Sequence, residues 1–272
     1  MSAGPFAVTK SNYLIRASYR LTLAEQRVIL CCLAQVDSRK RLQNSHTLEM
    51  QTEGLTVTAL DYAKLFELDP STAYRELQQA ADRLFNRTIT VKKNERGERT
   101  RTRWLQGDAR AEKGSGYIRL SFTLTLAEHM TQQRGKFTAY QLEQVRHLKR
   151  PAAIRLFELM MQWRDTGIVR IKLDDLREMM DMGYKTWADA SRYVFRPAIE
   201  DINAHTGYTA KLRAIKHGRK VDTVEITFTP NKQQSIEPIG DLLADVTSAS
   251  VPALCAGTAD LDATASTQPE RA

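Results

Sequence analysis

The chain has 272 residues, enough for two domains of ordinary size, and its 42% hydrophobic and 26% charged residues are typical of a folded protein. Its net charge of +8 favours a polyanionic partner, while the absence of long apolar runs and of a signal-like start argues against a membrane span and secretion. Cys31, Cys32 and Cys255 are too few for a disulfide framework and are expected to be small apolar fillers. We therefore expect a cytoplasmic protein.

The first half of the chain predicts the element order of a winged helix. Thr22 and Glu25 have capping-box spacing before apolar residues three and four apart, which indicates a helix start. Asp69 and Pro70 end one helix and begin another, because aspartate caps free amides and proline suits a first turn. In chain order we expect a helix from Thr22 to Val36, a strand over 55–58, a helix from Thr58 or Asp61 through Leu68, a helix over 71–86, and strands over 88–93, 101–105 and 117–124.

The second half predicts the same order again. A second capping pattern at Thr125 and Glu128 indicates a connecting helix. Asp174 or Asp175 is expected to cap a later helix that Gly183 ends. In chain order we expect an apolar helix over 150–163 with Pro151 in its first turn, a strand over 168–173, a helix through Met180, a helix over 189–203 stopped by Thr206 and Gly207, and strands over 208–215 and 221–228.

The predicted fold class is α+β, with two tandem winged-helix domains joined by a helical linker. Residues 231–272 hold two basic and six acidic residues and no sustained period, so we expect a flexible acidic tail. This leaves 38 basic and 26 acidic residues, a net charge of +12, in residues 1–230. The predicted parts are a flexible N-terminus over 1–10, an N-terminal winged helix over 11–125, a linker helix with a C-terminal winged helix over 126–230, and the tail over 231–272.

An ordered set of motifs lies between Arg150 and Pro230: Ala-Ile-Arg-Leu-Phe-Glu-Leu, Leu-Asp-Asp-Leu-Arg, Ala-Ile-Glu-Asp-Ile-Asn and His-Gly-Arg-Lys-Val-Asp-Thr-Val-Glu-Ile-Thr-Phe. This set resembles the C-terminal winged helix of plasmid replication initiators that bind repeated origin sequences. The first half is similar to the N-terminal winged helix of that family through Leu-Thr-Leu-Ala-Glu-Gln-Arg and Tyr-Arg-Glu-Leu-Gln-Gln-Ala-Ala-Asp-Arg-Leu-Phe. The resemblance spans residues 11–230.

The resemblance implies that the two domains bind a directly repeated origin sequence, the iteron, in two successive major grooves of double-stranded DNA. It also implies opening of an AT-rich region, recruitment of host factors such as the helicase and the host initiator, and dimers, formed through the N-terminal domain, that repress the protein's own gene. A transcriptional repressor without initiator activity needs the same DNA-reading surface and stays open as an alternative.

The helix expected over 189–203 carries the first base-reading candidates. Its apolar residues mark a core face, while Arg192 and Arg196, four residues apart, project from the other side. Arginine can donate two hydrogen bonds to guanine, although a surface pair bound to Asp189 or Glu200 is the alternative. The family that this chain resembles often has a run of arginines in this helix, whereas this chain has Ser191-Arg192-Tyr193 and Arg196. The bases that this chain reads can therefore differ from those read by other members. Pro197 should loosen or kink the helix, because residue 193 loses its bond partner. The matching candidates in the first domain are Ser71, Thr72, Arg75, Gln78 and Gln79.

Both predicted hairpins carry basic residues that could bind phosphates. Lys216, Arg219 and Lys220 surround Gly218 at the second tip, where long cations can reach DNA of any sequence. Such charge runs are also typical of a solvated face. The remaining phosphate candidates are Arg213 in the second domain and Lys92, Lys93, Arg96, Arg99, Arg101 and Arg103 in the first wing.

The sequence lacks the signatures of an enzyme, a metal site or a cofactor site. Its five histidines are never closer than 12 residues, so no His-x-His pattern exists, and no Gly-x-x-x-x-Gly-Lys-Ser/Thr phosphate loop is present. Asp174 and Asp175 fit helix capping better than metal binding. A metal-dependent nuclease that nicks the origin stays as the enzyme-class alternative.

Overall fold

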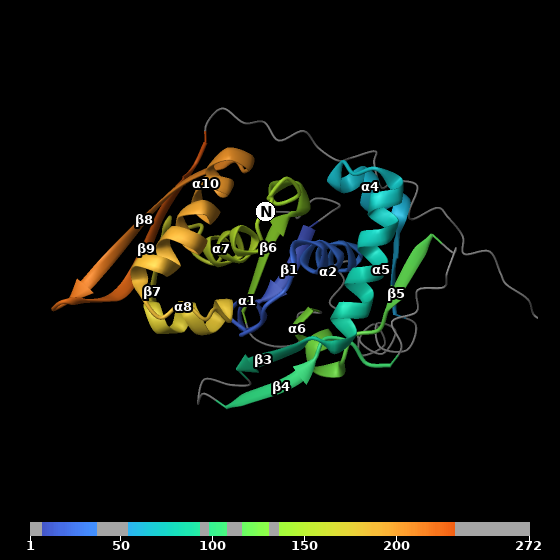
Figure 1. Ribbon diagram of the computed structural model, residues 1–272, viewed down its shortest axis with the longest axis horizontal. Helices are drawn as coiled ribbons and strands as arrows, with labels where there is room; N and C mark the ends of the chain where they lie inside the picture. Colours follow the sequence, from blue (N-terminus) through green and yellow to red (C-terminus); the bar gives the residue numbers. More distant parts are fainter. Residues whose placement is uncertain (1–6, 37–53, 93–97, 108–115, 131–135, 232–272) are drawn as a thin grey trace, which may run out of the picture.

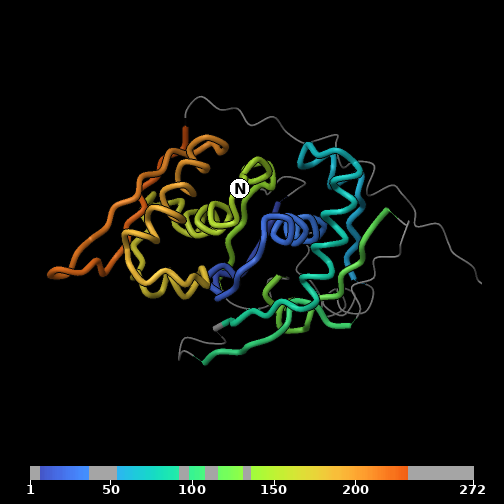
Figure 2. Tube along the Cα trace, in the orientation of Figure 1, coloured from blue at the N-terminus to red at the C-terminus, as the bar shows by residue number. Residues whose placement is uncertain are grey.

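The computed structural model describes residues 7–36, 54–92, 98–107, 116–130 and 136–231. Helices α4 (Ala59–Phe66) and α5 (Pro70–Asn86) lie at one end of the molecule (Figure 1). The hairpin of β8 (Tyr208–His217) and β9 (Lys220–Pro230) lies at the other end. Between them lie α7 (Pro151–Met161), β1 (Ala7–Ser11) and β6 (Phe137–Gln141). The trace in Figure 2 follows the same path. Residues 232–272 of the predicted tail, which include Cys255, fall outside the described residues, as do Lys93 and Arg96. Within the described ranges, no helix is long and apolar enough to cross a membrane.

The first winged-helix unit combines helices with two short antiparallel sheets. Its elements are α2 (Leu23–Gln35), β2 (Leu55–Thr58), α4 (Ala59–Phe66), α5 (Pro70–Asn86), β3 (Thr88–Lys92), β4 (Arg99–Arg103) and β5 (Tyr117–Leu120). Strands β3 and β4 form the wing, with Thr88 opposite Arg103. Strand β5 pairs instead with β2, placing Val57 opposite Ile118. The wing is therefore a two-stranded hairpin, and β5 closes the unit beside the strand that precedes α4.

The second winged-helix unit has the element order that the sequence predicts. Its elements are α7 (Pro151–Met161), β7 (Ile168–Lys172), α8 (Leu173–Met180), α9 (Trp187–Ala190), a π-helical turn (Ser191–Phe195), α10 (Arg196–His205), β8 (Tyr208–His217) and β9 (Lys220–Pro230). The antiparallel sheet has the order β7-β9-β8. Gly167 adopts a φ of 68° between α7 and β7, a conformation that favours glycine.

Several helix starts follow the predicted capping chemistry. The Thr22 hydroxyl accepts a hydrogen bond from the amide of Glu25 at 3.3 Å, and the Glu25 carboxylate accepts one from the amide of Thr22 at 2.8 Å. This capping box starts α2. Thr58 caps α4 and Asp69 caps α5 through their side-chain oxygens. These three starts confirm that local hydrogen bonding fixes the helix boundaries in the first unit.

Two predicted boundaries of α8 are wrong. The N-cap residue is Lys172, which makes no side-chain capping bond, and Asp174 and Asp175 lie within the first turn. Carboxylates in that turn are favoured by the helix dipole without capping the helix. The helix ends before Asp181, which adopts a left-handed conformation with φ 45°, so Gly183 lies beyond the end. Asparagine and aspartate tolerate the left-handed conformation better than most residues, so Asp181 can take the position at the helix end that glycine usually occupies.

A strand pair that the sequence did not predict lies between the two units. Its elements, with the short helices beside it, are β1 (Ala7–Ser11), α1 (Asn12–Ile15), α6 (Leu124–Met130), β6 (Phe137–Gln141) and a 3-10 turn (Leu142–Gln144). Strands β1 and β6 are antiparallel, with Thr9 opposite Ala139. Residues 7–10 were expected in a flexible N-terminus, but every residue of β1 is buried. Because α2 and α6 both contact β1, the strand lacks the alternating pattern of a half-exposed strand.

Helix α6 also differs from the prediction of a connecting helix capped by Thr125. It begins at Leu124, so Thr125 lies inside the helix, and the amides of Leu126 and Ala127 bind the carbonyl of Thr123. The helix contacts β1 and α1 and ends at Met130. A Thr-x-x-Glu pattern is a local signal, and here the preceding Thr123 starts the helix.

One continuous hydrophobic core runs through both units, and it includes Cys31 and Cys32 as predicted. Burial raises the pKa of both thiols. At the junction, the buried Arg155 of α7 donates to the carbonyls of Ile15, Ala17 and Met179 at 3.1, 2.8 and 3.1 Å. The first two carbonyls belong to α1 and the residues directly after it, and the third belongs to α8. A buried guanidinium therefore joins α7 to the α1 segment between the units and to α8 of the second unit.

A second buried charge lies one helical turn further along α7. The Glu158 carboxylate accepts from Lys10 Nζ at 2.5 Å and from the Tyr140 hydroxyl at 2.6 Å. Lys10 belongs to β1 and Tyr140 to β6. Burial, followed by the Glu158 charge, raises the pKa of Tyr140, so its hydroxyl stays protonated and can donate. The carboxylate therefore joins α7 to both strands of the central pair.

Candidate nucleic-acid interface

The long helix of the second unit has one buried face and one exposed face. Phe195, Ala198 and Ile202 are fully buried and Ile199 is nearly so, as predicted. Arg192 and Arg196 are exposed on the other side. The buried face therefore fixes the helix on the unit, while the arginines remain available to a ligand.

The middle of this helix is a π-helical turn, in which the amide of Arg196 binds the carbonyl of Ser191, five residues earlier. Pro197 has no amide hydrogen, so the regular bond to the carbonyl of Tyr193 cannot form. The predicted loosening of the helix near Pro197 is confirmed. It falls on the segment that carries Arg192, and such turns are frequent at functional sites.

The two arginines have no acidic partner among the described residues. Asp189 instead accepts a hydrogen bond from the Thr186 hydroxyl at 2.6 Å. The guanidinium carbon of Arg192 lies 5.4 Å from the ring centroid of Tyr193. In the described part of the chain, neither Arg192 nor Arg196 bonds to Asp189 or Glu200. The alternative of surface ion pairs with these acids is therefore not what the structure has.

The second wing presents an unbalanced positive tip. Lys216, Arg219 and Lys220 are exposed, and Gly218 turns the chain with a φ of 63°. Arg213 lies further down β8 and forms an ion pair with Glu225 at 2.8 Å. The three tip cations can therefore meet phosphates more freely than Arg213 can.

Glu225 is held between two arginines on the face of the β7-β9-β8 sheet. Arg170 Nε binds one carboxylate oxygen at 2.7 Å, and Arg213 binds the other at 2.8 Å. The hydrogen bond from Arg170 and the charge of Arg213 hold the pKa of Glu225 below its ordinary value. The carboxylate therefore remains charged at neutral pH and compensates part of the positive sheet face.

In the first unit, most candidates on α5 already have hydrogen-bond partners. The Ser71 hydroxyl donates to Asp69 at 2.5 Å, and this contact lowers the pKa of Asp69. Gln78 and Gln79 bind Tyr74 and Arg83 on the same helix. Thr72 is half-buried. Arg75 is exposed and has no bonded partner among the described residues, so it is the candidate on this helix most available for DNA.

The arginines of the first wing differ in their surroundings. Arg99 forms an ion pair with Glu178 of α8, Arg101 donates to Thr88 at 3.3 Å, and Arg103 lies 5.6 Å from the Phe85 ring centroid. Lys92 lies in β3, opposite Arg99 of β4. The wing is positively charged, but the guanidinium of Arg99 is already paired with Glu178 of the second unit.

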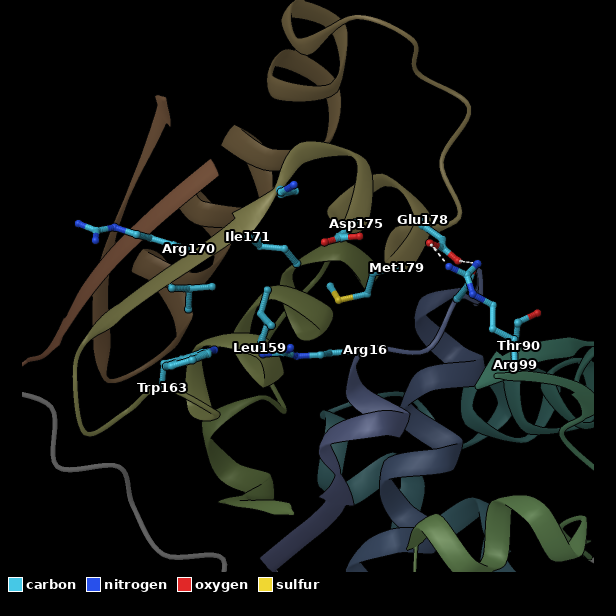
Figure 3. Close-up of a pocket in the computed structure, with 13 residues that line it drawn as sticks. Arg16, Thr90, Arg99, Leu159, Trp163, Arg170, Ile171, Asp175, Glu178 and Met179 are labelled. Atoms are coloured by element: carbon cyan, nitrogen blue, oxygen red, sulfur yellow. Dashed lines mark hydrogen bonds and ion pairs between the residues drawn. The ribbon is translucent and has the colours of Figure 1, made fainter. Parts of the chain in front are cut away.

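A cleft of about 260 Å³ is lined by residues of α7, β7 and α8, together with Arg16 and with Thr90 and Arg99 of the first wing (Figure 3). Arg99 and Glu178 face each other across one side, and Asp175 projects from the same helix. Arg16, also in the lining, donates to Gln162 at 3.0 Å. The cleft is therefore part of the junction between the units.

Comparisons with known proteins decide the family. Residues 7–161 match the family described as "Initiator Replication protein, WH1", and residues 172–228 match "Initiator Rep protein, WH2". The chain belongs to this family of replication initiators. Members of the family are DNA-binding proteins rather than enzymes, which removes the nuclease alternative. The predicted α+β fold with two winged helices is confirmed.

Individual relatives are distant but cover most of the initiator. A replication initiation protein of Escherichia coli is 25% identical over 236 residues, which are 84% of this chain and 71% of the relative. An uncharacterized 27.6 kDa protein of Escherichia coli is 26% identical over 211 residues, 75% of this chain and 87% of the relative. A crystal structure of the Pi initiator protein in complex with iteron DNA has a TM-score of 0.67 and 21% identity, and the match covers 85% of this chain and 100% of that one.

Two exposed aromatic residues of the initiator that were not predicted as site residues lie near the predicted base-reading arginines. Tyr184 lies between α8 and α9, and Tyr193 lies in the π-helical turn. Their rings stack, with centroids 5.9 Å apart. The position of Tyr193 next to Arg192 on the polar side of a helix was the signal that could have identified it. Tyr184 is brought there only by the folded loop.

Proposed function

We propose that this initiator starts plasmid replication by binding directly repeated sites, the iterons, in double-stranded origin DNA. The observation that carries the proposal is the exposed face of the α9–α10 helix, where Arg192 and Arg196 have no acidic partner within the part of the chain that the structure describes. Family membership supports a DNA-binding role in initiation. The similar fold of an initiator bound to iteron DNA supports duplex DNA as the ligand.

Two classes of contact divide the work within the second unit. Arg192 and Arg196 lie on a helix, the element that a major groove admits, and each can donate two hydrogen bonds to a guanine. Lys216, Arg219 and Lys220 lie on a hairpin tip, from which long side chains reach phosphates. The helix supplies sequence recognition, while the wing supplies affinity and orientation.

The first unit makes the weaker contribution to base recognition in this proposal. Arg75 is its most available candidate on α5, while Ser71, Gln78 and Gln79 must exchange intramolecular hydrogen bonds for contacts with DNA. Arg101 and Arg103, with Lys92, Lys93 and Arg96, are proposed to meet phosphates. A site read by both units spans two successive major grooves, about 20 bp at about 10.5 bp per turn.

Further parts of the proposal concern partners, location and boundaries. We propose that the bound initiator opens an adjacent AT-rich region, recruits the host helicase and host initiator, and works in the cytoplasm. A dimer formed through the first unit would repress the initiator's own gene. The boundaries at residues 10, 125 and 230 stay predictions, which limited proteolysis of the full chain can test.

Footprinting of the DNA that flanks the gene tests the proposal. We expect protection of tandem direct repeats and permanganate-reactive thymines in a neighbouring AT-rich stretch. Protection of a lone inverted repeat, without reactive thymines, would favour a repressor instead. Supercoiled DNA incubated with the initiator and magnesium should remain unnicked. Absence of any sequence-dependent protection would contradict the proposal.

A further inference from the structure

Tyr184 and Tyr193 form an exposed aromatic stack beside the arginines of the second unit. Tyr193 is 54% exposed and Tyr184 is 40% exposed. Their ring planes are 19° apart, with centroids separated by 5.9 Å. Each ring therefore shields one face of the other, while the rest of both rings remains in water.

The surroundings of the stack indicate what covers it. Arg192 lies 5.4 Å from the Tyr193 ring on one side, and the exposed Lys185 follows Tyr184 in the loop. Arg196 is exposed one turn further along the helix. The nearby acid, Asp189, is bound to Thr186. An aromatic surface framed by cations suits a polyanion with apolar groups rather than an uncharged protein surface.

The placement of Tyr193 also matches that of a base-contacting side chain. The exposed residues of α9 to α10 include Asp189, Arg192, Tyr193 and Arg196, which follow one another at spacings of one to four residues on one face. The π-helical turn contains Arg192 and Tyr193. A ligand that Arg192 and Arg196 contact must therefore also meet the Tyr193 ring.

We propose that Tyr193 contacts the C5 methyl group of a thymine next to a guanine read by Arg192. The inference rests on the proposed function, because it requires this helix to enter a major groove of the repeat. Thymine is distinguished in that groove by its methyl group, which apolar and aromatic side chains can contact. The Arg192 guanidinium gains orientation from the Tyr193 ring. Tyr184 is a positioning residue that holds the Tyr193 ring from behind.

A scan with deoxyuridine tests the contact directly. Each thymine of the repeat duplex identified by footprinting is replaced in turn by deoxyuridine, which removes only the methyl group. Wild-type affinity should fall about four-fold at one position, the change expected for one buried methyl-sized group. Tyr193→Ala should bind the unmodified repeat at least as weakly as wild type binds the repeat with deoxyuridine at the sensitive position. Its affinity should no longer change when that thymine is replaced by deoxyuridine. Tyr193→Phe, which keeps the ring, should behave as wild type.

The controls separate this inference from the proposed function. Leu124→Ala removes a side chain that is 52% exposed on α6, and it should leave the deoxyuridine profile unchanged. Tyr184→Ala should reduce the effect of the sensitive thymine without abolishing preference for the repeat.

If wild type prefers the repeat over a scrambled duplex but Tyr193→Ala keeps the full deoxyuridine sensitivity, the tyrosine contact is wrong while the proposed function stands. A loss in Tyr193→Phe equal to that in Tyr193→Ala would indicate a hydroxyl contact to phosphate and would overturn methyl recognition. If wild type shows no preference for the repeat, both proposals fail.

Discussion

Arg99 of the first wing and Glu178 of helix α8 form a two-point ion pair that joins the two winged-helix units. One guanidinium nitrogen, Nη2, lies 3.0 Å from Oε2, and Nη1 binds Oε1 (Figure 3). The side chains are 49% and 37% exposed, so water weakens the attraction. The pair is therefore expected to contribute little to stability, and we expect its main effect on the orientation of the wing relative to α8.

Arg99→Ala and Glu178→Ala should each lower the affinity for a complete repeat more than the affinity for half a repeat. The reason is that only the complete repeat requires both units in a fixed relation. A double-mutant cycle should give a coupling of up to about 1 kcal/mol in urea unfolding. Equal losses of affinity on complete and half repeats, for both variants, would show that the pair does not orient the units.

Glu158→Ala should lower the free energy of unfolding by about 3–5 kcal/mol, because it leaves the buried ammonium of Lys10 without its counter-charge. Tyr140→Phe removes one of the two donors and should cost about 1 kcal/mol. The matched control is Asp165→Ala, whose side chain is 97% exposed after α7. Urea unfolding measures all three. A loss in Glu158→Ala no larger than that in the control would contradict a structural role for this buried pair.

Glu225→Gln should destabilise the initiator at neutral pH, and the difference from wild type should shrink in acid. Arg170 and Arg213 lower the pKa of Glu225 in the folded state. Such a carboxylate contributes stability that is present above its unfolded pKa of about 4.3 and is lost as the pH falls through the lower folded pKa. Unfolding by urea at several pH values measures the difference, with Asp222→Asn on the same strand as control. A difference that stays constant with pH would contradict the ion-pair origin.

Local patterns predicted most of the fold because the signals act over a few residues. The Thr22 and Glu25 capping box and the buried face around Phe195 appear in the structure as expected. The strands β1 and β6 could not be predicted, since they are distant in sequence and β1 is buried throughout. The end of α8 was misplaced because Asp181 takes the left-handed conformation usually occupied by glycine.

The candidate site was predictable to the extent that it lies on one helix or one hairpin. The exposure of Arg192 and Arg196 follows from the spacing of apolar residues around them. The commitment of Arg99 to Glu178, and of Arg213 to Glu225, depends on contacts between elements far apart in the chain. The same is true of the Tyr184 and Tyr193 stack, which joins a loop to a helix.

Base reading by the second unit is the central claim, and a binding titration over several salt concentrations on repeat and scrambled duplexes tests it most directly. Arg192→Ala and Arg196→Ala should each cost about 1–3 kcal/mol on the repeat and much less on the scrambled duplex. Arg219→Ala and Lys220→Ala are the matched variants, which should weaken both duplexes about equally and reduce the salt slope by about one. Variants with wild-type thermal stability are compared. Equal losses on both duplexes for Arg192→Ala and Arg196→Ala would contradict base reading by this helix.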